Sequence, residues 1–419
     1  MVGPEVKAPN AADVDGRQPK RIALVTQGYQ TAGGIQTAAR WLVTGLRGAG
    51  LDVVIFDLAS SRVDAHSRRF RSFRSWRRTT LLSADASEPH VIHVGANGVE
   101  LEPLRYLGRA ELSAELDRFD LVQVVAGGPA LALAATKSKP PTVLQVATTV
   151  AWERSSQLAA TGPALALWRG VMTKAVSVME RAALRKADAV FVMNREMHSY
   201  VRSVSATRVI LAPPGVDTEQ FTPRSEGWAS AGYLLSVCRL NDARKGLERL
   251  IRAYARMREL RPSIPCLVLA GRGQFPAFLS QLIVELEMGR FITVRTDVPQ
   301  TELPSLYQGA SAFLQASYEE GFGISVLEAM ASGLPVVSTE TAGTRETVVH
   351  GQTGWLIGQE ADVEREIAER TISLWDGEAQ DLSRRSRSRA ISHFSNQVTL
   401  ARILAVYREL FDGRLMRDL

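Results

Sequence analysis

The chain has 419 residues, of which 45% are hydrophobic and 22% are charged, and its formal net charge is +6. This length exceeds what one hydrophobic core ordinarily supports, so we expect two domains. No run of eighteen apolar residues occurs, which argues against a membrane-spanning helix. The basic balance suits an anionic ligand, although a nucleotide, a membrane surface and a nucleic acid would each satisfy it.

The chain begins with a polar segment. Residues 1–20 lack the apolar core of a signal peptide, and we interpret them as a flexible tail. Further along, Cys238 and Cys266 lie inside apolar, strand-like runs. We therefore predict buried thiols in a reducing cytoplasm rather than a disulfide framework.

Short β-branched apolar runs alternate with amphipathic helical patterns along most of the chain. In the first half the predicted strands are 21–27, 51–59, 91–95, 121–127, 142–148, 189–194 and 208–215. In the second half they are 233–239, 266–271, 291–296, 312–317 and 335–340. Nearly continuous apolar runs are typical of parallel strands that are buried on both faces. The pattern predicts two doubly wound α/β, Rossmann-like domains that face each other across a cleft.

A stretch with proline and glycine but no periodicity, 212–232, separates the two halves. We accordingly predict a first domain at 21–215, a linker at 216–232 and a second domain at 233–392. The amphipathic segment 393–419 carries apolar residues at helical spacing, so it must dock on another surface.

Gly33 and Gly34 follow the first predicted strand and open a helix. Glycine there lets the backbone approach a phosphate at the helix N-terminus. The spacing is not G-x-G-x-x-G, and no acid stands where the ribose of a dinucleotide would need one, which argues against NAD. A structural turn that simply opens the helix explains the pair about as well.

Two cations follow the first strand of the second domain. Arg239 leaves that strand, and Lys245 stands just before a helix whose entry is marked by Gly246. Fixed cations beside a helix N-terminus suit a diphosphate and would stabilise its charge as it departs. Ordinary surface charges on a solvated turn are the alternative, and we assign the neighbouring Arg244 to the surface.

Two carboxylates flank a short run with two glycines. Glu320 lies in the loop after strand 312–317, and Glu328 lies about one turn into the helix that follows. Between them the backbone amides converge at the helix start, as a site for phosphate oxygens or a sugar hydroxyl. These amides belong to Phe322, Gly323, Ile324 and Ser325. A carboxylate accepts two hydrogen bonds, so the pair suits a sugar at one side and a ribose at the other.

Several longer segments resemble the retaining family 4 glycosyltransferases, which have the GT-B fold. They are APPGVDTEQF, RLNDARKGLERLIRAY, LVLAGRG and EGFGISVLEAMASGLPVVSTETAGTRETVVHGQTGWL, and with the glycine pair they follow the family's order from residue 21 to about 358. The resemblance implies transfer of a GDP- or UDP-linked hexose without a metal or other cofactor. It also implies that the first domain binds the acceptor and that the C-terminal helix crosses back onto it.

The resemblance also implies roles for matching positions. Glu320 would contact the donor sugar, Glu328 the ribose, and Arg239 and Lys245 the diphosphate. We take Arg239, Lys245 and Glu320 as the catalytic residues.

The remaining donor positions come from glycines and one arginine. Gly33 and Gly34 would approach the diphosphate, and Gly321 directly follows the sugar-binding carboxylate. Gly271 and Arg272 would lie near the base.

The sequence departs from the family in one place. Where members usually carry a histidine facing the donor sugar, Ala147 and Thr148 stand here. One explanation is a slipped alignment or a local substitute such as Thr148, Thr149 or Gln145. The other is an unusual donor sugar or acceptor, which points to antibiotic or other specialised-metabolite biosynthesis.

The acceptor side is less defined. Residues 62–80 carry seven arginines with interleaved aromatic residues, which suits peripheral membrane contact or an acceptor phosphate as well as a solvated loop. We expect no nucleic acid, because no nucleic-acid motif accompanies this segment. Trp152 could stack on an acceptor beside Thr148, or belong to the core.

We therefore predict a glycosyltransferase with a small-molecule acceptor, and cell-envelope glycan or glycolipid assembly as the alternative. A sugar-nucleotide epimerase and a non-catalytic nucleotide-sugar-binding protein are alternatives from other classes. The oligomeric state stays open.

Overall fold

The computed structural model describes residues 19–31, 33–59, 61, 64–70, 72–77, 81–82, 90–158 and 163–413. The predicted tail therefore lies outside the described residues, except for its last two positions. The chain divides into two compact units, and each is described by itself. The first comprises Met1–Phe191, Tyr200–Ile210 and Val406–Leu419, and the second comprises Val192–Ser199 and Leu211–Ala405.

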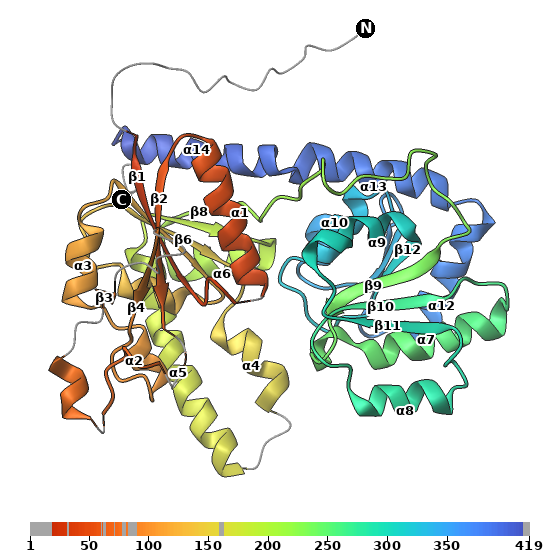
Figure 1. The fold of residues 1–419 in the computed structure, drawn as a ribbon, viewed down its shortest axis with the longest axis horizontal. Coiled ribbons are helices and arrows are strands. Elements are labelled where there is room, and N and C mark those ends of the chain that lie inside the picture. The colour runs from red at the N-terminus through yellow and green to blue at the C-terminus, as the bar shows by residue number, and fades with distance from the viewer. Residues whose placement is uncertain are drawn as a thin grey trace, which may run out of the picture. The chain divides into compact units, whose positions relative to one another are not determined.

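A mainly parallel sheet forms the centre of the first unit (Figure 1). Within the described residues it has eight strands in the order β3-β4-β2-β1-β5-β6-β7-β8. They are β1 (Arg21–Gln27), β2 (Asp52–Leu58), β3 (Leu81–Leu82), β4 (Val91–Val94), β5 (Leu121–Ala126), β6 (Thr142–Val146), β7 (Ala189–Val192) and β8 (Arg208–Leu211). The short β3 runs antiparallel to β4, whereas β1 runs parallel to both β2 and β5. All residues of β5, β6 and β7 are buried, which is why their sequences are continuous apolar runs.

Helices connect these strands. They are α1 (Gly34–Gly48), α2 (Glu102–Arg105), α3 (Ala110–Leu116), α4 (Val150–Leu158), α5 (Pro163–Lys186) and α6 (Arg195–Val204), with the 3-10 turns η1 (Phe73–Arg77) and η2 (Pro129–Ala134). The buried residues of α1 recur at helical spacing, so one stripe of the helix covers the sheet. They are Ala38, Ala39, Leu42, Val43 and Leu46.

The second unit is also built on a parallel sheet. In the described residues its six strands follow the order β11-β10-β9-β12-β13-β14. They are β9 (Tyr233–Arg239), β10 (Leu267–Arg272), β11 (Ile292–Thr296), β12 (Ala310–Gln315), β13 (Val336–Thr339) and β14 (Trp355–Ile357). With the first sheet, this arrangement confirms the predicted α/β, doubly wound class. The strand β14 was not predicted, since only three residues form it.

The helices of the second unit follow its strands. They are α7 (Leu247–Leu260), α8 (Ala277–Glu285), α9 (Leu303–Gly309), α10 (Ile324–Ala331), α11 (Thr344–Thr347), α12 (Val363–Ser373) and α13 (Ala379–Phe394), with the turns η3 (Ala243–Lys245), η4 (Gln300–Glu302) and η5 (Leu374–Asp376). Their apolar faces join the strands in one core, in which Leu250, Tyr254 and Leu269 are fully buried.

The last helix, α14 (Asn396–Phe411), belongs to the second unit up to Ala405 and to the first from Val406 onward. In the first unit Tyr407 is buried, and its hydroxyl donates a 2.6 Å hydrogen bond to Oε1 of the buried Gln123 on β5. Glu409 pairs with Arg208 on β8. These contacts confirm that the C-terminal helix packs on the N-terminal sheet.

The predicted linker 216–232 is bonded to the second unit. Trp228 Nε1 donates to the carbonyl of Ser311 at 2.7 Å, and Arg224 donates to the carbonyl of Gly309 at 2.7 Å. The boundaries proposed for the domains and the linker stay predictions.

The prediction of two buried thiols is wrong for Cys266, which is exposed. Cys238 on β9 is partly exposed, and its surroundings raise the pKa of the thiol to about 12 through burial. Cys266 immediately precedes β10, so the apolar run that suggested burial begins one residue later. In the part of the chain that the structure describes, no helix combines the length and apolar content needed to cross a bilayer.

Candidate functional site

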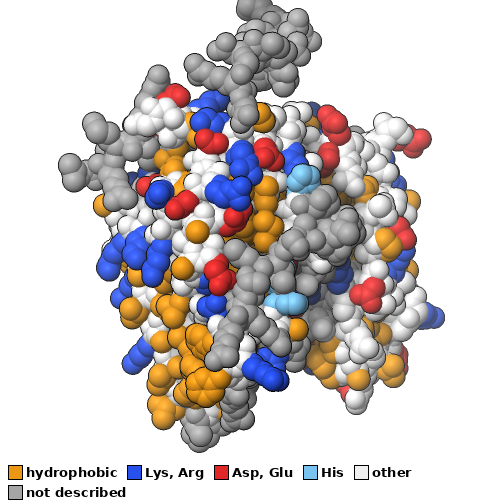
Figure 2. Space-filling view, turned by 60° about the vertical axis from the view of Figure 1, so that its left-hand side comes forward, with side chains coloured by type: hydrophobic (Ala, Val, Ile, Leu, Met, Phe, Trp, Pro, Cys, Tyr) orange, Lys and Arg blue, Asp and Glu red, His pale blue; other side chains and the backbone are white. Residues whose placement is uncertain are grey.

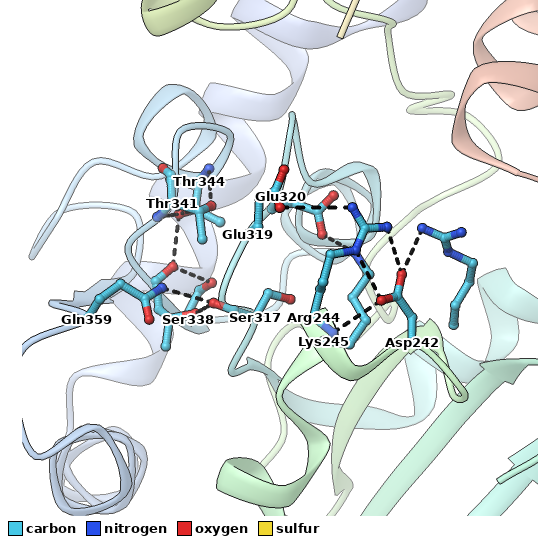
Figure 3. A network of polar contacts seen from close by, with 12 residues as sticks. Asp242, Arg244, Lys245, Ser317, Glu319, Glu320, Ser338, Thr341, Thr344 and Gln359 are labelled. Carbon is cyan, nitrogen blue, oxygen red and sulfur yellow. Dashed lines mark hydrogen bonds and ion pairs between the residues drawn. The ribbon is translucent and has the colours of Figure 1, made fainter. Parts of the chain in front are cut away.

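An ion pair connects the segments that follow two neighbouring strands of the second unit. Lys245 closes η3 after β9, and Glu320 lies in the loop after β12, which is paired with β9. Lys245 Nζ lies 2.5 Å from Glu320 Oε2, and the two side chains are 14% and 18% exposed (Figure 3). The carboxyl ends of parallel strands meet at one edge of a sheet, which is where such folds bind ligands. The structure therefore brings together the predicted diphosphate cation and the predicted sugar-binding carboxylate.

Asp242 gathers two arginines beside this pair. Its Oδ2 lies 2.9 Å from Nη2 of Arg239 and 2.9 Å from Nη2 of Arg244. Burial acts to raise the pKa of Asp242, but the hydrogen bond and charge of Arg244 and the charge of Arg239 outweigh it, so the pKa is lowered. Arg239 is 55% exposed and open to a ligand. Arg244, expected at the surface, is only 25% exposed, because it is bonded to this carboxylate.

Two glycines are required here by the backbone itself. Gly246 has φ 61°, and a Cβ on it would lie 2.0 Å from the carbonyl oxygen of Ala316. Gly271 has φ 149°, and a Cβ there would lie 1.7 Å from the carbonyl oxygen of Cys238. Close approach of β10 to β9 thus explains Gly271 without any ligand, and its predicted position near a base stays a prediction.

Arg272, the second residue predicted near the base, ends β10. It is exposed, and its Cα is the register partner of Arg239 on β9. Two arginines therefore stand side by side at the carboxyl ends of β9 and β10.

The last part of the loop between β12 and α10 is packed into the protein. Gly323 caps α10 with φ 82°, and Phe322 is 3% exposed, so its ring is directed into the protein. The N–H of Gly343 donates to the carbonyl of Glu320 at 2.9 Å, and a Cβ on Gly343 would lie 2.5 Å from the backbone of Phe322. Gly343, which was not predicted from the sequence, thus allows the loop between β13 and α11 to pack closely against the loop between β12 and α10. Gly321, Ile324 and Ser325 are partly exposed along the same loop and helix start.

A network of hydroxyl and amide groups holds the end of β12 (Figure 3). The carbonyl of Ser317 accepts from Thr339 Oγ1 at 2.6 Å and from Gln359 Nε2 at 3.0 Å. Thr344 Oγ1 donates to the carbonyl of Thr339 at 2.9 Å and accepts from the N–H of Thr341 at 2.8 Å. Because these groups fix the loop's origin, the position of Glu320 is set by the fold.

Glu328 is buried, with 7% of its surface exposed, and Oε2 accepts a 2.8 Å hydrogen bond from the hydroxyl of Tyr307 on α9. Burial raises the pKa of Glu328 to about 7, against the smaller lowering effect of that hydrogen bond. The sequence motif predicts a ribose at this carboxylate, but no sequence pattern indicates Tyr307 as its partner. The ribose contact stays a prediction.

In the first unit, a cavity of about 190 Å³ at the ends of β1 and β5 is lined by Thr31, Ile35 and Gln36, which stand on either side of the glycine pair in the chain. A Cβ on Gly34 would have no described atom within 4 Å, so the fold leaves open space there. A Cβ on Gly33 would lie 2.3 Å from Oε1 of Gln36. A larger cavity, of about 360 Å³, includes Thr142 at the opposite end of β6, away from the ligand-binding edge. Open space beside Gly34 agrees with a close ligand approach, which stays a prediction.

Thr148 and Trp152 follow β6. Thr148 is partly exposed and donates its N–H to the carbonyl of Gly127 at 3.0 Å. Trp152, on α4, is half-buried, with its ring centroid 5.5 Å from that of Tyr200. The tryptophan therefore already has one aromatic partner, and its contact with an acceptor stays a prediction.

Glu180 on α5 is a buried carboxylate near these residues that sequence analysis missed. It is 1% exposed; Oε1 accepts from the N–H of Val150 at 2.9 Å, and Oε2 has no hydrogen-bond partner among the described residues. Burial raises its pKa to about 7, although the Val150 hydrogen bond and the charge of Arg154 lower it. A Cβ on Gly128 would lie 2.7 Å from Oε1, so glycine makes room for this carboxylate. Glu180 therefore holds the N-terminus of α4, the helix on which Trp152 lies. In the sequence, the feature that could have indicated Glu180 is that it is a single acid among the cations of α5.

A second cluster that the sequence did not predict lies beside β4. Asp64 accepts from Ser67 Oγ at 2.5 Å and lies 2.9 Å from His93 Nε2, while the rings of His93 and His66 are 5.9 Å apart. Burial acts to raise the pKa of Asp64, but Ser67 and the charge of His93 outweigh it and lower the pKa. In the described part of the chain, no three His, Cys, Asp or Glu side chains gather as a metal site.

Two family descriptions match this chain. Glycosyltransferase Family 4 matches residues 32–220, and Glycosyl transferases group 1 matches residues 220–392. Together they span the chain from the glycine pair to the end of the second sheet's helices.

Curated relatives match over shorter stretches. A D-inositol 3-phosphate glycosyltransferase of Pseudarthrobacter chlorophenolicus is 33% identical over 36% of this chain and 38% of its own length. A GDP-mannose-dependent alpha-(1-6)-phosphatidylinositol monomannoside mannosyltransferase of Mycolicibacterium smegmatis is 31% identical over 42% of this chain and 52% of its own. The chain thus spans about two fifths to a half of these relatives.

Solved structures match over nearly the whole chain. Sucrose-phosphate synthase of Thermosynechococcus elongatus has a TM-score of 0.67 at 20% identity, covering 94% of this chain and 100% of the other. Anabaena HepE in complex with UDP has a TM-score of 0.68 at 17% identity, covering 93% of this chain and 100% of the other. At these identities the likeness establishes the fold, and it confirms the predicted architecture.

Proposed function

Since the chain belongs to the group 1 and family 4 glycosyltransferases, we propose that it transfers a sugar from a nucleoside-diphosphate sugar to an acceptor of cell-envelope glycan or glycolipid assembly. One observation carries the proposal: Lys245 and Glu320 meet at the carboxyl edge of the second sheet. The relatives named for inositol phosphate and phosphatidylinositol mannoside support the envelope acceptor. The comparisons give no support to antibiotic biosynthesis.

The proposed reaction retains the configuration of the sugar. Cleavage of the anomeric C–O bond leaves negative charge on the diphosphate and positive charge on the sugar ring. Lys245 and Arg239 would stabilise the diphosphate, while Glu320 would accept a hydrogen bond from a sugar hydroxyl. The departing phosphate oxygen takes the proton of the acceptor hydroxyl, whose oxygen bonds to the anomeric carbon on the same face. This step needs no separate protein base.

The nucleoside would occupy the other side of the same edge. Glu328 would accept from a ribose hydroxyl through the carboxylate oxygen that Tyr307 does not use. Arg272, exposed beside Arg239, would face the base. A GDP- or UDP-linked donor satisfies this arrangement equally.

A sugar-nucleotide epimerase is the second candidate, and one observation favours it. Such an enzyme would use carboxylate and histidine groups at its reaction centre, and Asp64 and His93 form such a pair in the first unit. The pair belongs to a different unit from Lys245 and Glu320, and the family match favours transfer.

The test is product analysis by mass spectrometry. Purified protein is offered UDP- and GDP-hexoses together with inositol phosphate, phosphatidylinositol or a cell extract. A hexose-sized mass gain on an acceptor, with release of UDP or GDP, supports the proposal. An interconverted nucleotide sugar without release supports epimerisation. Donor binding without either product would make the chain a binding protein.

A further inference from the structure

The helix α5 has two unlike faces. One side packs into the first unit, and its buried residues are Val176, Glu180, Ala183 and Leu184. The other side leaves large apolar side chains in solvent. Among them, Leu167 is 72% exposed, Val178 67%, Trp168 52% and Val171 50%.

Five of the exposed residues of α5 form one stripe. Leu167, Val171, Lys174, Val178 and Arg181 recur at intervals of three or four residues, which places them on one face of a helix. We call this stripe, together with Trp168, the α5 face. It is apolar at its start and gains cations toward its end.

The charge of α5 has a single sign at the surface. Between residues 165 and 186, where the side chains are described, the helix carries Arg169, Lys174, Arg181, Arg185 and Lys186. Its one acid in that stretch, Glu180, is buried on the opposite side. Figure 2 shows hydrophobic side chains gathered low on this surface, with Lys and Arg around them.

We propose that the α5 face docks on an anionic lipid bilayer. Contiguous exposed apolar side chains mark interaction surfaces. An apolar stripe with cations and without exposed acids matches an interface where apolar groups enter the acyl boundary and cations contact lipid phosphates. A negatively charged protein partner would satisfy the cations but gives no reason for the apolar stripe.

Another segment of the same unit also combines exposed aromatic and basic side chains. On and beside η1, Phe73 is 91% exposed and Phe70 49%, and Arg74 is exposed as well. This is part of the segment 62–80 for which sequence analysis offered membrane contact. The α5 face adds a helix that the sequence pattern did not single out.

The experiment is co-sedimentation of the full chain with vesicles, without any sugar substrate. Phosphatidylcholine vesicles with roughly one third phosphatidylglycerol are compared with phosphatidylcholine alone, at low and high salt. We expect binding to the anionic vesicles that weakens with salt. The double variants Leu167→Ser with Val178→Ser, and Lys174→Gln with Arg181→Gln, should each weaken it by roughly tenfold or more.

Matched controls lie on the second unit. Val284 on α8 is 72% exposed, as Leu167 is, and Arg256 on α7 is exposed. Val284→Ser and Arg256→Gln should leave vesicle binding unchanged.

Three results would overturn the proposal. The chain fails to bind anionic vesicles, the serine variants bind as the parent does, or they only break up a self-associated form seen by light scattering. Because the assay involves no sugar transfer, its outcome is separate from that of the proposed function. Release of nucleoside diphosphate from a soluble donor should be unchanged in these variants.

Discussion

Lys245 Nζ lies 2.5 Å from Glu320 Oε2, between residues that are 75 positions apart in the chain. In the proposed reaction one side chain serves the diphosphate and the other the sugar. Without a ligand, the two side chains form an ion pair in a largely buried setting, and each holds the other in place. A bound diphosphate would share the lysine, so the pair is arranged before the donor arrives.

Replacing Lys245 by alanine should lower kcat by roughly 100- to 1000-fold, because a stabiliser of the leaving group is lost. The same size of loss is expected for Glu320→Ala. Release of nucleoside diphosphate under saturating donor, with circular dichroism to verify folding, measures it. The control is Arg252→Ala, which breaks the exposed ion pair with Glu248 at 3.0 Å. Near-parental turnover in the Lys245 variant would remove that residue from the proposed mechanism.

Glu328 should make stability depend on pH. Its pKa is raised by burial to about 7, so between the ordinary pKa of 4.5 and 7 the folded state holds a proton that the unfolded state has lost. Stability is therefore highest at the acid end of that window and falls as the pH rises through it. Glu328→Gln should remove this decline, by up to roughly 3 kcal/mol.

Denaturation of the parent and the Gln variant at a series of pH values checks this slope. The pKa of Glu180 is also raised, so the same measurement on Glu180→Gln tests the corresponding effect in the first unit. Equal slopes in the parent and the Glu328 variant would contradict the prediction.

Glu180 should act as a positioning residue for α4. Glu180→Ala removes the acceptor of the Val150 N–H and should raise the KM for the acceptor by roughly tenfold, the usual effect of losing one buried hydrogen bond. The KM for the donor should stay the same. Glu180→Gln keeps an oxygen for that N–H and should recover most of the loss. A rise in both KM values, without recovery by glutamine, would indicate general destabilisation instead.

The strands and the contiguous motifs of this fold could be predicted from the sequence, whereas contacts between residues far apart in the chain could not. Runs such as 233–239 predicted β9 with its bounds, because burial on both faces leaves a continuous apolar signature. The glycines and acids of the loops could also be predicted, because the residues of each motif are adjacent in the sequence. The partner of Glu328 could not, because Tyr307 lies 21 residues away on another helix and resembles any core tyrosine.

The same limit explains the missed residues of the first unit. Glu180 meets Val150 across 30 residues, and Asp64 meets His93 across 29. Neither distance is a helical or strand period, so only the packed sheet brings these groups together. The exposure of Cys266 was missed for a different reason, since an apolar run does not mark which residue begins the strand.

Two glycines that both precede or open helices should respond oppositely to alanine. At Gly246 the left-handed φ of 61° and the carbonyl of Ala316, 2.0 Å from a Cβ, leave no room, so Gly246→Ala should destabilise the second unit by roughly 1–2 kcal/mol or more. At Gly34 no described atom lies within 4 Å of a Cβ, and alanine favours a helix, so stability should be kept or rise by up to roughly 1 kcal/mol. If the open space admits a phosphate, Gly34→Ala should nevertheless lower turnover by roughly tenfold or more. Thermal unfolding measures the stability of both variants, and nucleotide release measures their turnover. Together they distinguish a glycine that the backbone conformation requires from one that a ligand requires. A fully active Gly34→Ala protein would assign that glycine to the turn alone.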